Sequence, residues 1–500
     1  MVAITLALTM ALQVPTDTGQ GGSRPCQVAI DNMPRAAQTI NGRDTNYFGA
    51  GGVRAHCLGT GTTLAADSFA HYGAFRRMDL VGHVAIRDTG LALDANFVSY
   101  FLRDERLEAH NNVVAVNRRT GTVLRGPNLK YWRVAQGVRD TVEMYATQRP
   151  TVEYRQSTPS DSAQQEPYII VGDRLRFKGD DRMWAGGKVT IDRSDFASRS
   201  DSMQLDQIAG FGVLVGKPSV EGRGRAGTGD SGKGYTLVGT RIELTLAERE
   251  IRAVKALGRG KATGSDWTLT ADTIELHIAN RVLQQTFAWG DTARPHAVSA
   301  LYTIQSDSLA IDSPGEVLTE SRAFGKAFAT AKRDSTVPAN QTDWVTGDSI
   351  TLRFVQDSDS VTKRPHSRLS ELLARGLARA LTHHQDKTET TRLGPAINYS
   401  RGQQITLTML RDRIDTCSSS ERPTAYTWSP DRPWKPTASS ARRLIPHDRP
   451  DRPPPGRHLH HFHLLHRLPF RDRTRSLLRS VCDARLLARA GGCGARAHRR

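Results

Sequence analysis

A short phrase recurs along most of this 500-residue chain and limits what the chain can fold into. The phrase runs from an apolar residue through small residues to Asp and then alternates apolar positions, as in TLTADTIEL at 268–276. Two further copies, at 123–131 and 236–244, keep this frame with Pro127 and Thr240 in the aspartate position. The aspartates of the other copies are Asp67, Asp94, Asp173, Asp201, Asp272, Asp307 and Asp348.

A second phrase usually follows the first within one strand length and a turn. It consists of a small or Gly-containing pair before a short apolar alternation, as in VGHVAI at 81–86 and GGKVTI at 186–191. Alternation with a period of two is typical of a strand that has one face inward. Each unit therefore predicts strand, turn, strand and turn, and the whole body predicts an all-β fold of repeated antiparallel strand pairs.

The repeated aspartates have a structural interpretation that outweighs a chemical one. Asp and Gly both tolerate unusual backbone angles, and Asp can hydrogen-bond its own backbone. We therefore expect turn residues at the start of strands. Metal binding is disfavoured because the aspartates are spread from Asp67 to Asp348.

One segment gives conflicting signals. SRLSELLARGLARAL at 367–381 has helical apolar spacing, and its residues have high helix propensity. The repeat frame instead makes Ala374, Arg375 and Gly376 the second phrase of a unit. We predict a strand here, because the frame is shared with the other units.

The ordered series from TLAADSFAHY through RRMDLVGHVAI and LALDANFVSYF to TGTVLRGPNLKY resembles the OstA/LptA (organic solvent tolerance) family. The similarity is closest over 60–133, and weaker copies continue to about 410. It implies an extended, V-shaped, solenoid-like β-jellyroll without catalytic residues or cofactors. The chain departs from the family in having several domain lengths of repeat and no outer-membrane barrel after them.

The domain organisation that follows has seven parts. We expect a signal segment at 1–20, a linker at 21–44, OstA-like units at 45–155, 167–262 and 263–416, a linker at 156–166, and a tail at 417–500. The first residues, MVAITLALTMAL, form the apolar run that an export signal needs, although no Lys or Arg precedes it. Cys26 and Cys57 are the only cysteines before the tail, and they can form one disulfide after export.

The resemblance implies a function in lipid transport. Members of the family shield acyl chains in an apolar interior and add to one another edge to edge, so we expect lipopolysaccharide or another acylated lipid and other OstA-like proteins as partners. The expected location is the periplasm or the outer membrane. Groove candidates are the residues predicted to point inward. They are Leu80, Val84, Ile86, Leu93, Phe97, Leu107, Val114, Val116, Leu124, Leu129, Ile274 and Leu276.

Two other functions compete with this hypothesis. A closed core has the same alternation as an open groove, so an adhesin-like interaction protein without lipid fits the pattern as well. A pectate-lyase-like β-helical enzyme fits less well, because spacings of 27 to 46 residues between phrases exceed a regular coil and no acid–base cluster converges. Photo-crosslinking to lipid at inward positions would separate lipid transport from the adhesin-like alternative.

Two motifs resemble sites of chemistry but lack the necessary context. GTGDSGKG at 227–234 fits G-x-x-x-x-G-K, but a predicted strand follows where a P-loop needs Ser or Thr and a helix. The same run contains the GDSG of serine proteases without a matching His segment. We therefore interpret residues 222–234 as a flexible hairpin loop.

The net charge of +18 does not by itself predict nucleic-acid binding. Residues 417–500 hold 18 of the 69 Lys and Arg residues but only 6 of the 51 acidic ones. This basic, Pro- and His-rich tail begins where the strand pattern ends, and a shifted reading of the codons after Thr416 restores an apolar, turn, apolar sequence. We interpret the tail as frameshifted or disordered. A genuine tail that binds anionic lipid or nucleic acid is the alternative.

Overall fold

The computed structural model describes most of the body of the chain. The described residues are 26–59, 61–135, 137–155, 166–223, 234–247, 250–264, 267–299, 302–331, 342–358, 365–384, 396–410, 413–420, 424–429 and 432–436. The chain divides into two units, Met1–Ser439 and Ser440–Arg500, and the second lies outside the described residues. The predicted signal segment 1–20, the glycine-rich run 224–233 and the His-rich tract 458–466 also lie outside them.

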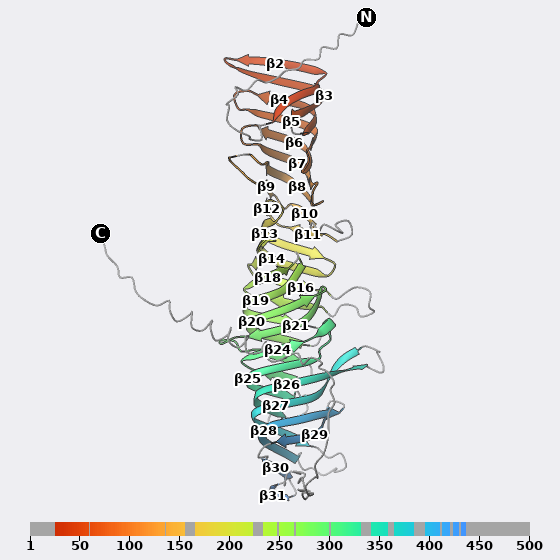
Figure 1. The fold of residues 1–500 in the computed structure, drawn as a ribbon, viewed down its shortest axis with the longest axis vertical. Coiled ribbons are helices and arrows are strands. Elements are labelled where there is room, and N and C mark those ends of the chain that lie inside the picture. The colour runs from red at the N-terminus through yellow and green to blue at the C-terminus, as the bar shows by residue number, and fades with distance from the viewer. Residues whose placement is uncertain are drawn as a thin grey trace, which may run out of the picture. The chain divides into compact units, whose positions relative to one another are not determined.

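The described body is all-β, as predicted, and its 31 strands belong to one antiparallel sheet (Figure 1). Fourteen strands run through both halves of the sheet. They are β3 (Asp44–Leu58), β4 (Thr63–Tyr72), β5 (Arg77–Arg87), β6 (Leu91–Phe101), β7 (Arg106–Asn117), β8 (Val123–Trp132), β13 (Arg182–Arg193), β14 (Phe196–Asp206), β19 (Glu250–Thr263), β20 (Trp267–Ala279), β25 (Glu320–Ala331), β26 (Trp344–Ser358), β27 (Pro365–His384) and β28 (Ala396–Leu410).

The other rungs of the sheet consist of two short strands each. These pairs are β1 (Gln27–Asn32) with β2 (Arg35–Asn41), β9 (Glu143–Thr147) with β10 (Thr151–Tyr154), β11 (Tyr168–Val171) with β12 (Arg174–Lys178), β15 (Phe211–Val215) with β16 (Ser219–Gly222), β17 (Tyr235–Val238) with β18 (Arg241–Ala247), β21 (Val282–Trp289) with β22 (His296–Ser299), β23 (Tyr302–Gln305) with β24 (Ser308–Asp312), and β29 (Arg413–Ser420) with β30 (Thr424–Ser429). One strand, β31 (Arg432–Pro436), and a 3₁₀ turn, η1 (Pro314–Glu316), complete the described elements.

Every rung bends once, and the bend divides the sheet into two walls. The ladder between long neighbouring strands breaks near the middle, for example between Gly186 and Val189 in the β13–β14 pair. The half of β13 before the break pairs with β12, and the half after it pairs with β11. We call the wall that contains β2, β9, β12, β15, β18, β21, β24 and β29 wall 1, and the wall that contains β1, β10, β11, β16, β17, β22, β23 and β30 wall 2.

The two recurring phrases of the sequence meet at this bend, which we call the corner. The second phrase supplies two successive residues with positive φ, such as Gly187 (81°) and Lys188 (47°). The first phrase supplies the facing aspartate: the Asp173 N–H donates to the Gly187 carbonyl over 2.9 Å, and a Cβ on Gly187 would lie 2.7 Å from the Asp173 Cβ. Only a residue without a side chain fits here at low cost.

The prediction that the aspartates begin strands holds for Asp173 and Asp307, which directly precede β12 and β24, and is wrong for the other five, which lie inside a long strand. The aspartates at a corner mark the middle of a rung, where they serve the turn from one wall to the other. Asp67, Asp201, Asp272, Asp307 and Asp348 face the glycine or turn of the next rung in the same manner as Asp173. Asp94 is the exception, because it lies before the break in the β6–β7 ladder, where it pairs with Val114, and it forms an ion pair with Arg87.

The conflict over 367–381 is settled in favour of the predicted strand. Residues 365–384 form β27, and Gly376 and Leu377 form its corner with φ of 75° and 48°. Leu372 and Leu373 lie in one half of the strand, and Ala378 and Ala380 lie buried in the other. Pairing with both β26 and β28 outweighs the helical propensity of the segment.

The predicted boundaries between units are wrong, because the sheet runs through them. Strand β10 pairs with β8 before the predicted linker 156–166 and with β11 after it. Residue 262 lies inside β19, and residues 27–41 form β1 and β2 where a linker was expected. Strands also continue to Pro436, which is beyond the predicted start of the tail at 417. The described body is one continuous unit.

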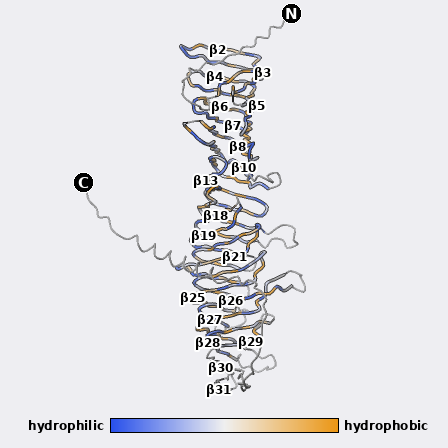
Figure 2. The backbone as a smooth tube through the Cα atoms, viewed as in Figure 1, coloured by the Kyte–Doolittle hydropathy of each residue, from blue (hydrophilic) through white to orange (hydrophobic). Residues whose placement is uncertain are grey.

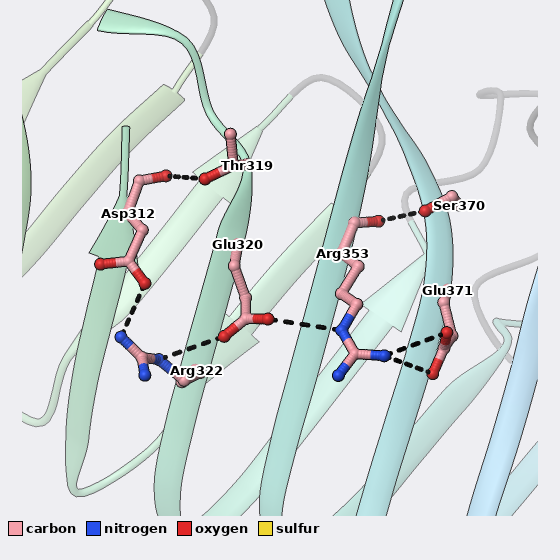
Figure 3. A network of polar contacts seen from close by, with 7 residues as sticks. All are labelled: Asp312, Thr319, Glu320, Arg322, Arg353, Ser370 and Glu371. Carbon is pink, nitrogen blue, oxygen red and sulfur yellow. Dashed lines mark hydrogen bonds and ion pairs between the residues drawn. The ribbon is translucent and has the colours of Figure 1, made fainter. Parts of the chain in front are cut away.

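Hydrophobic and hydrophilic residues alternate along the strands (Figure 2). On the outer face of wall 1, an ion-pair ladder crosses four neighbouring strands, β24 to β27 (Figure 3). Arg322 lies 2.6 Å from Asp312, and Arg353 lies between Glu320 and Glu371 at 3.4 and 3.2 Å. Such cross-strand pairs favour one register and add modestly to stability in a solvent-facing network.

We expect Gly187→Ala to lower the free energy of unfolding by about 2 kcal/mol, because the added methyl would meet Asp173 in a left-handed backbone conformation. Gly179→Ala is the matched control: its φ is 63°, but a Cβ there meets nothing within 4 Å. The control is expected to cost about 1 kcal/mol, from the backbone alone. Urea denaturation measures both, and equal losses would contradict this account of the corner.

Cys26 and Cys57 form the expected disulfide, which ties the residue before β1 to the end of β3. The loop of 31 residues predicts a loss of up to about 4 kcal/mol when both cysteines become Ser. We expect this loss to appear as faster amide hydrogen exchange in β1 to β3. Strands β26 to β28 are the internal control, and a uniform increase along the chain would argue against a local effect.

Candidate functional site

The interior between the walls is one continuous apolar core. The buried residues that form it extend from Cys26 to Leu407 and come from both walls. Nine predicted groove residues lie in this interior and are at most 2% exposed. These are Leu80, Val84, Ile86, Leu93, Leu107, Leu124, Leu129, Ile274 and Leu276. The sequence thus predicts the inward position of these residues, whereas a role in lipid binding is a separate matter.

Three predicted groove residues do not point inward. Phe97 is half-buried on the outer face, with its ring 6.0 Å from that of His110, because the inward positions of β6 change from Leu93 and Ala95 to Val98 and Tyr100 across the corner. In β7 the inward residues are Val113 and Ala115, so Val114 and Val116 face outward. The error has one physical cause: alternation was extended without knowing where the corner falls.

Side chains fill most of the space between the walls and leave small cavities there. One cavity of 20 Å³ is lined by Leu91, Leu124, Met144 and Phe177 among others, and another of 10 Å³ lies between β1 and the first long rungs. Volumes of this size correspond to about one water molecule. An acyl chain would therefore have to displace inner side chains at these places.

The corner closes one side of the interior, and polar side chains close the other. There, hairpins join successive rungs at the free margin of each wall, and no backbone ladder connects the two margins in the ranges described above. We call this side the mouth. Wall 1 contributes residues 102–105, 133, 179–181, 207–210 and 280–281 to it, and wall 2 contributes 61–62, 88–90, 118–122 and 194–195.

Arg133 makes the most extensive contact across the mouth. Its guanidinium donates to Thr62 Oγ1 over 3.0 Å and lies 3.6 Å from Asp88, both on wall 2. On its own wall it lies 3.9 Å from Glu105, whose carboxylate also accepts a hydrogen bond of 2.5 Å from Tyr100. The Arg133, Asp88 and Glu105 side chains are 19%, 10% and 12% exposed, so water screens their charges only weakly.

The pKa values of two tyrosines next to this cluster show that the cluster is shielded from water. Burial, and then the nearby charge of Asp88, raise the pKa of Tyr131 to about 12. Burial, and then the Glu105 carboxylate, also raise the pKa of Tyr100 well above its usual range. Both hydroxyls therefore stay protonated at neutral pH and remain hydrogen-bond donors.

Three further side-chain contacts also join wall 1 to wall 2 across the mouth. Asp180 of wall 1 accepts a hydrogen bond from Asn117 Nδ2 over 2.7 Å and pairs with Arg119. Gln207 of wall 1 donates to the hydroxyl of Tyr154. Lastly, Arg281 of wall 1 lies 3.9 Å from Asp195.

The two sides of the interior thus differ in kind. Covalent chain and backbone hydrogen bonds hold the corner, whereas exchangeable side-chain contacts hold the mouth. Water can replace each mouth partner at modest cost once the contact is exposed. The mouth is therefore the line along which the walls can separate. Its residues could not be predicted from the sequence, because a charged residue in a hairpin that contacts the opposite wall has the same local pattern as one in a solvated turn.

Neither metal chemistry nor a membrane-spanning helix appears in the described part of the chain. No group of three or more His, Cys, Asp and Glu residues there could hold a metal ion. Among the same residues, no helix is long and apolar enough to cross a membrane. No protein-family model matches the chain, and no curated protein matches it either.

We expect Arg133→Met to lower the free energy of unfolding by roughly 3 kcal/mol, because Asp88 and Glu105 would lose their nearly buried partner. Arg119→Met is the matched control, since its side chain is 76% exposed despite its contact with Asp180, and we expect a loss below about 1 kcal/mol. Thermal denaturation compares the two. If both variants were equally stable, the cluster would not hold the mouth.

Proposed function

We propose that this chain is a periplasmic lipid-transport or outer-membrane assembly protein of the OstA/LptA type. In this proposal the two walls form a V-shaped β-jellyroll that shields acyl chains, with lipopolysaccharide or another acylated lipid as the cargo. One observation carries the proposal: a single apolar interior continues across the rungs from Cys26 to Leu407, and side-chain contacts close it along the mouth in the part of the chain that the structure describes. No catalytic step is part of it.

The energetics favour a long interior for such a cargo. Each shielded CH₂ group is worth about 0.8 kcal/mol, so a lipid with several chains needs apolar surface from many rungs. The polar residues of the mouth, such as Arg133 and Asp180 of wall 1, would then lie beside the head group. Because the inner side chains are packed, loading requires the mouth contacts to break and the walls to move apart.

The location and partners in this proposal rest on two further features. The Cys26–Cys57 disulfide is of a kind that persists in oxidising compartments such as the periplasm. Strands β1 and β2 pair only with β3 among the described strands, and the residues of β2 are exposed. Such an edge can accept a strand from another OstA-like protein.

The close packing of the interior favours a second candidate function. Inner residues such as Leu93 and Ile274 are 0% exposed, as in a plain core, and the two inner cavities hold no more than about one water each. An envelope interaction protein that binds no lipid explains this packing without any movement of the walls.

A crosslinking experiment tests the proposal and separates it from the second candidate. A photo-crosslinker replaces Ile278, which is partly buried against the core near the wall 1 margin, and the control replaces Trp289, which is 39% exposed on the outer face of the same wall. We expect lipopolysaccharide adducts at 278 and none at 289 when the protein is isolated from envelope extracts. Absence of adducts at 278, or equal adducts at both, would favour the interaction protein.

A further inference from the structure

The outer face of wall 1 contains a hollow that the lipid-transport proposal does not use. Its volume is 570 Å³, and it spans β9, β12, β13, β14, β15 and β18. The hollow is on the opposite face of the wall from the core, because Leu175, Ala185 and Met203 are buried beneath it while Arg176, Trp184 and Gln204 alternate with them.

The lining residues combine aromatic rings with arginines. Tyr145, Trp184 and Phe211 supply rings, Val213 and Val215 supply apolar surface, and no Asp or Glu is among the lining residues. The arginines are Arg174, Arg176 and Arg241. By contrast, the ion-pair ladder on β24 to β27 of the same wall alternates acids and bases (Figure 3), and none of its residues lines the hollow.

The three arginines have different partners. Arg176 pairs with Glu143 at 3.1 Å, and Arg241 pairs with Glu243 at 3.0 Å, so these two carry carboxylates at the margin of the hollow. The described residues place no carboxylate on Arg174. Its guanidinium covers Gly186, where a Cβ would lie only 3.0 Å from Nε. The absence of a side chain at Gly186 therefore makes room for the positively charged guanidinium of Arg174 in the hollow.

The aromatic residues offer flat apolar surface beside these charges. Trp184 is half-buried, and the Arg176 guanidinium lies 5.5 Å from the centre of its ring. A partly exposed tryptophan beside an arginine fork can pack against an apolar ring face while the fork binds a carboxylate or phosphate. A sugar ring with an acidic substituent presents both features, because its C–H face is apolar and its hydroxyls can also reach Glu143 or Glu243.

We propose that this hollow binds an acidic oligosaccharide, a sugar chain that carries carboxylate or phosphate groups. The position in the middle of the wall disfavours an extended peptide, since the backbone groups of these strands already pair with one another. Because Arg176 and Arg241 are already paired with carboxylates, the hollow offers too few free cations for a nucleic-acid backbone, which binds by neutralising several phosphates. This binding does not depend on lipid in the interior.

The test uses the full chain and defined probes. Tetragalacturonate is the acidic saccharide, and maltotetraose, inorganic phosphate, a poly-glutamate peptide and single-stranded DNA are the comparisons. Isothermal titration calorimetry gives the dissociation constants. We expect tetragalacturonate to bind and to bind at least about tenfold more tightly than each comparison probe, which corresponds to one charge-assisted hydrogen bond. Failure to bind, or equal or tighter binding of any comparison, would overturn the proposal.

Variants locate the binding to the hollow. Arg174→Gln and Trp184→Ala are each expected to weaken binding about tenfold, and Gly186→Ala should also weaken it by pushing the Arg174 guanidinium aside. Trp289→Ala removes an exposed tryptophan of the same wall outside the hollow and should change binding by less than about twofold. If Trp184→Ala unfolds the protein, Arg174→Gln decides the outcome. Equal losses in Arg174→Gln and Trp289→Ala would overturn the assignment. The crosslinking experiment at Ile278 tests lipid binding in the interior, so its result does not affect the test of this hollow.

Discussion

The pairing of an aspartate with two left-handed residues in the next rung is the constraint on which the structure depends. Where Asp173 meets Gly187, the strand turns without leaving the sheet, and the ladder resumes on the other wall. Repetition of this contact aligns the bends of successive rungs, so the inner faces of both walls meet in one core. Without it, the same alternating strands would have no reason to bend at a common place.

This corner also makes the interior asymmetric. Its closed side is built into the chain, while the opposite side depends on contacts such as those of Arg133 and Asp180, which lie in hairpins. Separation of the walls at the mouth would therefore leave the ladders within each wall intact. The inner surface could therefore become exposed to a ligand while the secondary structure stays the same. This property follows from the topology, whether the protein carries a ligand or serves only as a scaffold.

Sequence patterns predicted the all-β class, a strand over 367–381 and the inward position of nine of the twelve groove candidates, because these depend on local alternation and a repeated frame. They did not predict that Phe97 and Val114 face outward, since the corner decides the alternation of each half-strand. The unit boundary at 156–166 failed for a similar reason: local composition does not reveal that β10 and β11, the strands on either side of this segment, pair with each other. Contacts across the mouth join residues distant in sequence, and a single sequence does not reveal such pairs.

Each inner rung of the described body pairs with the rung before it and the rung after it, and this has a consequence for how such a chain changes length. Two rungs joined by a hairpin are a unit that can be duplicated or lost without altering the pairing of distant rungs. Each such event would change the stack by about 10 Å, twice the spacing of neighbouring strands. The number of aspartate–glycine corners in the sequence thus sets the length of the stack, and selection can change that length by whole rungs.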